Sequence, residues 1–285
     1  MEKHFETTGP IRLKVELQTG DVTLAASDGV VTSVRLVPHG RGAEELAERF
    51  TVELRGDEVV VIAPKGRDGF FGLGTRGAVD VEVRLPEGSD ADVKTGSGDV
   101  SASCLLAVVR AATGSGDLAF HEVGSGDLKS GSGDVSLTAS GGDLTVRTGS
   151  GDVSVGSVAG VADLVSGSGD ISVRRAERRL KVKTGSGDVR VLASGDDVDL
   201  MTGTGDCELA GVSGGEIRAR TGTGDVVVAV ASGVAAYLDL NTVTGDVRVE
   251  LDDADDPGDS ESTTRLSVQS GSGDIRVKRA QGSLA

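Results

Sequence analysis

Aromatic side chains are scarce in this sequence: its 285 residues include five Phe, one Tyr and no Trp. A globular core of this size normally draws much of its buried area from aromatic rings. Val, Leu, Ile and Phe together are nevertheless too numerous for a disordered chain. The core must therefore consist of small aliphatic side chains, which indicates a thin and repetitive architecture.

Cysteine is also rare. The two thiols, Cys104 and Cys207, lie far apart and form no CxxC pair, which excludes a disulfide framework and fits a reducing compartment. No run approaches the ~18 apolar residues of a membrane-spanning helix. The first residues, MEKHFETTGP, contain no apolar segment of the kind that directs export. We therefore expect a cytoplasmic protein with no direct membrane insertion.

Positive charge is in deficit. The chain has 45 Asp and Glu against 29 Lys and Arg, for a formal net charge of −16. Nucleic-acid phosphates and anionic lipid surfaces repel such a chain. We therefore expect neither of them as a partner.

Glycine, by contrast, is abundant, with 44 residues. Much of it belongs to the tetrapeptide Gly-Ser/Thr-Gly-Asp, which occurs ten times and recurs every 18 residues between Asp134 and Asp206. A related Thr-Gly-Asp ends at Asp246. A fixed period near 20 residues is the signature of a solenoid.

Each repeat has the same internal pattern. The Asp is followed by a short strand of alternating apolar and polar residues, such as Val189-Arg-Val191, and then by a loop. A second alternating strand follows and ends in Thr or Ser, as Leu180-Lys-Val182-Lys-Thr184 does. Alternation with period two places the apolar side chains on one face of each strand. We predict an all-β fold, a parallel β-helix or β-solenoid of about ten two-strand coils of ~18 residues.

The period does not extend over the whole chain. Residues 1–90 carry strand patterns without it and one helical stretch, at 43–49. We predict that this region is a strand-rich N-terminal cap that closes one end of the stack, with a first coil near 13–22 separated from the others by an insertion. Residues 91–285 are predicted to form the solenoid, continuous with the cap and interrupted by an acidic loop insertion at 252–262.

The recurring aspartates are predicted to build turns, because Gly permits unusual backbone angles and the neighbouring Asp can accept backbone N–H groups. Carboxylates stacked ~4.8 Å apart cost roughly 1 kcal/mol per neighbouring pair even in water. Backbone donors, nearby Arg side chains or a bound cation must offset this repulsion. The predicted structural turn residues are Asp99, Asp117, Asp134, Asp152, Asp170, Asp188, Asp206, Asp225, Asp246 and Asp274.

Calcium is the alternative use of these carboxylates. Asp134, Asp143 and Asp152 come closest to the nine-residue spacing of a calcium β-roll. Here, however, Asp directly follows Gly, and most half-turns lack a second Gly-Asp. We therefore expect no metal and no cofactor, with these three residues as the weak calcium candidates.

Two catalytic sequence motifs occur in the chain, but neither has the structural context that its chemistry needs. Residues 72–77 match GxGxxG, but a strand pattern follows where a dinucleotide site needs a helix. Residues 211–215 match a nucleophile elbow but lie in a solenoid loop with no His partner. A sugar-cleaving solenoid would need paired carboxylates in a groove with aromatic platforms, which this composition does not supply. We predict that the protein is not an enzyme.

One glycine-rich segment, GRDGFFGLGTRG at 66–77, holds Phe70, Phe71 and Leu73. These side chains either fold back as a plug of the core or present an apolar anchor to a partner protein. They are the candidate partner-binding residues of the sequence.

The TGSGDV-x-V repeats of residues 91–279, with the opening LKVELQTGDVTLAASDG and the later VEVRLPEGSDADVKTGSGDV, resemble the toastrack domains, a bacterial "putative adhesin" family. The resemblance covers nearly the entire chain. It implies a right-handed β-helical stack, no catalytic residues, and a scaffolding or signal-sensing role in envelope-stress systems.

From the residues and this resemblance we predict a non-enzymatic scaffold or protein-interaction module. Its partner would be an unidentified protein, with a membrane-associated one among the candidates. The solenoid ends would also allow homo-oligomers, because exposed strands offer backbone partners. A calcium-binding surface adhesin is the alternative function.

Overall fold

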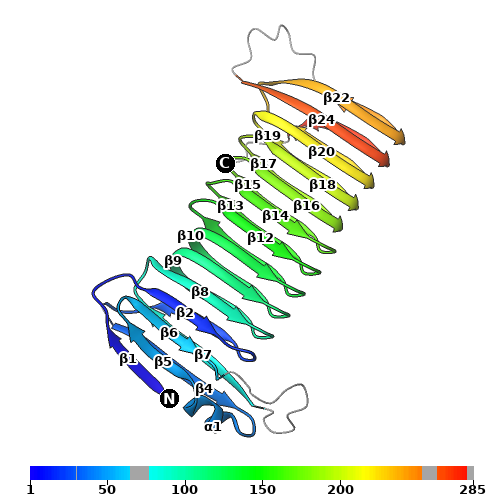
Figure 1. Cartoon of the computed structure of the whole chain (residues 1–285). Coiled ribbons are helices and arrows are strands. Elements are labelled where there is room, and N and C mark those ends of the chain that lie inside the picture. The colour runs from blue at the N-terminus through cyan, green and yellow to red at the C-terminus, as the bar shows by residue number, and fades with distance from the viewer. Residues whose placement is uncertain (30, 65–76, 252–261, 281–285) are drawn as a thin grey trace. The chain divides into compact units, whose positions relative to one another are not determined.

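The computed structural model describes residues 1–29, 31–64, 77–251 and 262–280. It is nearly all β, and the predicted parallel β-solenoid is confirmed (Figure 1). The chain divides into two units, Met1–Leu137 and Thr138–Ala285. No helix in the described ranges is long and apolar enough to cross a membrane, since α1 (Ala43–Glu48) has six residues.

The second unit is a stack of two-strand coils in which every strand pairs in parallel with its counterpart in the neighbouring coil. Because the strands pair in register, side chains at equivalent repeat positions stack in columns. Ile171, Val189 and Cys207 are neighbours in one such column. The strands are β12 (Leu144–Thr148), β13 (Val153–Val158), β14 (Ala162–Ser166), β15 (Ile171–Ala176), β16 (Leu180–Ser186), β17 (Val189–Ser194), β18 (Val198–Thr204), β19 (Cys207–Val212), β20 (Gly215–Thr223), β21 (Val226–Val230), β22 (Val234–Thr244), β23 (Val247–Glu250), β24 (Ser262–Ser272) and β25 (Ile275–Arg279).

The last coil in the sequence is not the last coil in space. β24 pairs with β20 on one side and with β22 on the other. β25 lies in the same way between β21 and β23. The coil of β22 and β23, called the end coil below, is therefore the outermost coil of this unit (Figure 1).

The first unit also contains a coil that lies between two coils from later in the sequence. β2 lies between β6 and β8, and β3 lies between β7 and β9. Antiparallel strands complete its outer edges, since β5 pairs with β6 and β1 with β4. Its strands are β1 (Glu2–Glu6), β2 (Arg12–Glu16), β3 (Val22–Ala26), β4 (Val31–His39), β5 (Thr51–Arg55), β6 (Glu58–Ile62), β7 (Ala78–Leu85), β8 (Ser89–Thr95), β9 (Val100–Thr113) and β10 (Leu118–Ser130), while β11 (Val135–Ser140) crosses the unit boundary.

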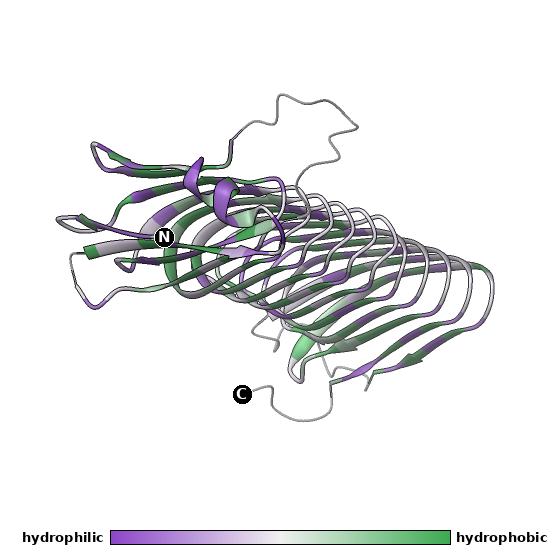
Figure 2. Cartoon of the chain, turned by 90° about the horizontal axis from the view of Figure 1, so that it is seen from below, coloured by the Kyte–Doolittle hydropathy of each residue, from purple (hydrophilic) through white to green (hydrophobic). Residues whose placement is uncertain are grey.

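The core is a single layer of small aliphatic side chains from each strand. Leu180 and Val182 of β16 and Val189 and Val191 of β17 are all buried, and the residues between them face solvent or the neighbouring coil surface. Hydrophilic and hydrophobic positions accordingly alternate along the strands in Figure 2. No large ring is needed because the two strands of a coil face each other across a narrow interior.

The Thr or Ser that ends the second strand of each repeat has a structural use. The buried Thr184 hydroxyl donates to the carbonyl oxygen of Gly169 at 3.0 Å, and Ser166 does the same for Gly151. Ser166 Oγ also accepts the N–H of Gly169 at 2.8 Å. The hydroxyl thus satisfies corner backbone groups that would otherwise be buried without a partner.

Candidate functional site

The corner aspartates form a ladder of hydrogen bonds in each unit. In the second unit, Oδ1 of Asp170 accepts the backbone N–H of Asp188 at 2.8 Å, and Oδ1 of Asp188 accepts that of Asp206. The steps from Asp152 to Asp170, Asp206 to Asp225, Asp225 to Asp274 and Asp274 to Asp246 have the same form, at 2.7–2.9 Å. Backbone donors therefore lie where the stacked negative charges need them.

The first unit has its own ladder. The N–H of Asp21 donates to Oδ1 of Asp80, and the N–H of Asp99 donates to Oδ1 of Asp21, each at 2.9 Å. Asp117 and Asp134 continue the series at 2.8 Å. Asp80 Oδ2 also lies 2.8 Å from Nε2 of His39. A carboxylate outside the Gly-Ser-Gly-Asp motif thus begins this ladder.

Two of the three calcium candidates accept a backbone N–H through their carboxylates, and the third donates its own backbone N–H. Asp143 Oδ1 accepts the N–H of Val161 at 2.8 Å, and Asp152 Oδ1 accepts that of Asp170 at 2.9 Å. The N–H of Asp134 donates to Asp117. Over the described ranges of the chain, no group of three or more His, Cys, Asp or Glu could hold a metal ion. None of these contacts favours calcium.

One copy of the Gly-Ser-Gly-Asp motif is not a corner. Residues 124–127 lie inside β10, where Asp127 stands in register with Arg110 of β9. Asp127 Oδ2 pairs with Lys129 at 2.8 Å, whereas its buried Oδ1 has no hydrogen-bond partner. The tetrapeptide alone therefore does not determine a turn.

Both cysteines are buried and free. Burial raises the pKa of the Cys207 thiol to about 12, with the carboxylates of Asp206 and Asp188 adding to the effect. Burial likewise raises the pKa of Cys104. Such thiols are poor nucleophiles because their thiolate forms are scarce. The candidate partner-binding residues Phe70, Phe71 and Leu73 lie outside the described residues.

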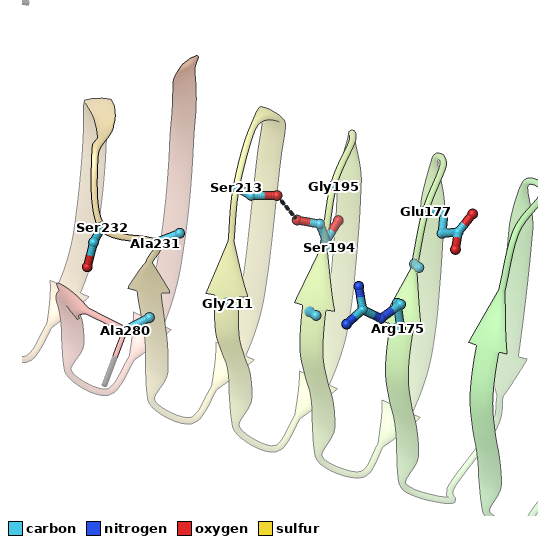
Figure 3. A pocket seen from close by; sticks show the side chains of 11 residues that line it. Arg175, Glu177, Ser194, Gly195, Gly211, Ser213, Ala231, Ser232 and Ala280 are labelled. Carbon is cyan, nitrogen blue, oxygen red and sulfur yellow. Dashed lines mark hydrogen bonds between the residues drawn. The ribbon is translucent and has the colours of Figure 1, made fainter. Parts of the chain in front are cut away.

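A groove of about 760 Å³ crosses several coils of the second unit (Figure 3). Small residues line most of it, and Ser213 Oγ donates to the carbonyl oxygen of Ser194 at 3.0 Å. Arg175 and Glu177 supply its charges. This lining offers hydrogen bonds and one charge of each sign but no nucleophile with an adjacent base.

The end coil is the most unusual surface of the second unit. Its inward-facing residues Val247 and Val249 are 45% and 49% exposed, although their register partners Ile275 and Val277 are fully buried. On β22, Leu238 is partly exposed, and Tyr237 and Val243 are 58% and 83% exposed. Leu238, Val247 and Val249, whose register partners are buried, are thus open to solvent beside two exposed apolar side chains.

The backbone of the end coil is also open. The described strands that pair with β22 and β23 are β24 and β25, each on one side only. Among the strands that the structure describes, none pairs with the outward N–H and C=O groups of β22 and β23, which form an edge of a parallel sheet. The sequence predicts that solenoid ends offer backbone partners, but its strand pattern did not identify which coil is the end, because residues 238–242 and 247–249 alternate as those of a buried coil do. Val243, which stands where the buried coils have Gly203, Gly222 and Gly271, is the local difference.

The edges of the first unit differ in chemistry. Its outer strand β1 (Glu2–Glu6) has the sequence EKHFE. The last residues of β5 include Glu53 and Arg55, which form an ion pair. Charged edge strands resist the addition of further strands. The apolar open edge is thus a feature of the second unit.

Comparison with known families assigns the chain. Residues 10–197 and 142–284 match Toastrack DUF4097. The chain belongs to this family. The toastrack resemblance predicted from the repeats is therefore confirmed.

Solved structures similar to this toastrack chain have low sequence identity. One, described as a "putative lipid binding protein" of Parabacteroides distasonis, is 16% identical with a TM-score of 0.41, over 97% of this chain and 96% of that chain. Another, a "putative adhesin" of Bacteroides fragilis, is 13% identical with a TM-score of 0.40 over the same shares. No curated protein matches the toastrack chain.

Proposed function

We propose that this toastrack protein is a non-enzymatic interaction module that joins protein chains through its end coil. The observation that carries the proposal is the exposure of Val247 and Val249, at positions that are buried in the adjacent coil. Covering them would bury apolar area, which is the main driving force of protein association.

The rest of the structure supports a scaffold more than a catalyst. The corner carboxylates accept backbone N–H groups within the fold. The two thiols are buried, and burial raises the pKa of each. Rows of identical coils held by in-register ladders give a rigid support on which an end surface keeps its geometry.

The test compares two lysine substitutions of similarly exposed valines. Val249→Lys places a charge in the end coil, whereas Val161→Lys alters a valine that is 44% exposed on another coil. Wild type, both variants and a Phe70→Ser, Phe71→Ser double variant would be immobilised and used to capture proteins from native cells, with quantitative mass spectrometry.

We expect the Val249→Lys protein to lose captured chains that wild type and Val161→Lys retain. Equal capture by all proteins would overturn the proposal. Loss in the double-Phe variant alone would move the contact to residues 66–77. Recovery of envelope-stress components among the captured chains would support the link that the family resemblance implies.

A further inference from the structure

The end coil has the properties of a surface that matches itself. Leu240 and Val249 occupy inward positions on its two strands, in register with the buried Val268 and Val277 of the adjacent coil. Two residues separate each of them from the corner at 243–246. A single two-fold axis perpendicular to the sheets can therefore pass between Leu240 and its counterpart in a second copy and also between the two Val249 residues.

Antiparallel pairing about that axis brings complementary side chains together on β23. Val249 meets Val249 of the second copy, and Arg248 meets Glu250 in both directions. The like-charge contact that opposes self-association of an acidic chain is thus avoided at this strand. Arg248 and Glu250 are exposed, and their present partners, Asp246 and Arg276, lie on the same chain.

The register on β22 is equally favourable. Pairing centred on Leu240 sets Tyr237 opposite Val243 of the second copy, and these are the two most exposed large apolar side chains of the coil. Asp239 faces Asn241, a carboxylate opposite an amide donor. Leu238 and Leu240 of the two copies stack in the interior as the leucines and valines of successive coils do.

We propose that two copies of the chain associate end coil to end coil about this axis, which extends both sheets through the dimer. The inference rests on the proposed function, because it names the partner of the same surface. A second copy supplies what the site requires: two strands at the spacing of the coil, small inward aliphatic residues, and charges that alternate in the opposite direction.

The geometry also selects a closed dimer over a filament. A filament would require the end coil to pair with an edge of the first unit, and those edges are the charged strands β1 and β5. An isologous two-fold contact uses both end coils and leaves no free copy of the surface.

The first measurement is the mass of the full chain by sedimentation velocity from 1 to 100 µM, concentrations on the order of typical Kd values for modest interfaces. We expect twice the chain mass of 28.8 kDa. Val249→Lys should shift the species to monomer by placing two like charges on the axis. Val161→Lys should leave the dimer intact.

The second measurement tests the register and does not depend on a disruptive variant. Tyr237→Cys and Val243→Cys proteins would be oxidised with copper phenanthroline and oxygen, separately and after mixing. The mixture should form covalent dimers at least severalfold faster than either protein alone, because position 237 faces position 243 of the other copy. The native thiols are buried and contribute little background.

The outcomes separate this inference from the proposed function. If the chain is a monomer at all concentrations but Val249→Lys abolishes capture of another protein, the self-association is overturned and the proposed function stands. If Val249→Lys abolishes no association of any kind, both are overturned. A dimer in which each cysteine protein cross-links alone as fast as the mixture overturns the register.

Discussion

Asp188 and Asp206 are one coil apart, and the Oδ1 atom of the first accepts the backbone N–H of the second at 2.8 Å. This bond repeats at every step of the ladder in the second unit. It turns a column of like charges into a set of cross-coil hydrogen bonds. The aspartates therefore act between coils as well as within each turn.

Removing one ladder acceptor should destabilise the second unit. We expect Asp188→Ala to lower the free energy of unfolding by about 1 kcal/mol, because the N–H of Asp206 loses its partner. Asp188→Asn should cost less than about 0.5 kcal/mol, since its amide oxygen still accepts the bond. Urea denaturation followed by circular dichroism measures both.

The matched control for this change is Asp199→Ala. Asp199 lies in the same unit, and its buried Oδ1 makes no hydrogen bond. Its removal should leave stability unchanged or slightly raise it. An equal loss in Asp188→Ala and Asp199→Ala would show that the ladder bond contributes nothing.

Glycine at the corner is required by close approach of neighbouring coils. A Cβ at Gly187 would overlap the backbone carbonyl of Gly169 in the adjacent coil. Gly187→Ala should therefore lower the free energy of unfolding by on the order of 2 kcal/mol or more. The melting temperature should fall accordingly. Gly195→Ala is the control, because the nearest atom to its Cβ would be the Glu177 oxygen at 3.7 Å. Similar melting temperatures for the two variants would contradict the close packing.

The Cys207 thiol should make stability depend on alkaline pH. Its pKa rises from 9.0 to about 12 on folding, so above pH 9 the unfolded chain releases a proton that the folded chain keeps. The contribution of this thiol to stability is constant below about pH 9 and falls by about 1.4 kcal/mol per pH unit between about pH 9 and about pH 12. Cys207→Val, which matches Val189 and Val226 in the same column, should flatten this part of the profile. Identical slopes in both proteins would exclude the effect.

The order of coils predicts an unusual response to truncation. A chain that ends at residue 251 lacks β24 and β25, the strands that pair with β22 and β23. Amides of residues 234–250 should then lose their protection in hydrogen-exchange mass spectrometry. A chain that ends at residue 280 is the control and should keep it. Retained protection in the shorter chain would mean that the end coil pairs elsewhere.

Local pattern was sufficient for the elements of this fold. The alternation in Leu180–Val182 and Val189–Val191 predicts two half-buried strands, and the structure has them as β16 and β17. The helical stretch at 43–49 corresponds to α1. These features depend on neighbours within a few residues, so a period-two or helical pattern is enough to reveal them.

Asp127 shows where the pattern fails. Its tetrapeptide is the same as that of Asp134, yet it lies within β10 because pairing with β9 continues through it. Asp134, Asp143 and Asp152 stay the weak calcium candidates of the sequence. Spacing alone could not reveal that the carboxylates of Asp143 and Asp152 accept N–H groups from the next coil.

The repeat pattern is enough to specify the unit of construction: a two-strand coil with small aliphatic residues inside and a Gly-Asp corner. The order in which the coils stack emerges from the folded chain, which leaves Val247 and Val249 exposed while the later Ile275 and Val277 are buried. Every coil presents nearly the same parallel edge and the same column of apolar side chains, so the strand pattern does not distinguish one neighbour from another. Val243, at a corner where the buried coils have Gly, is the local difference in the end coil, and the order of stacking is selected by the whole chain.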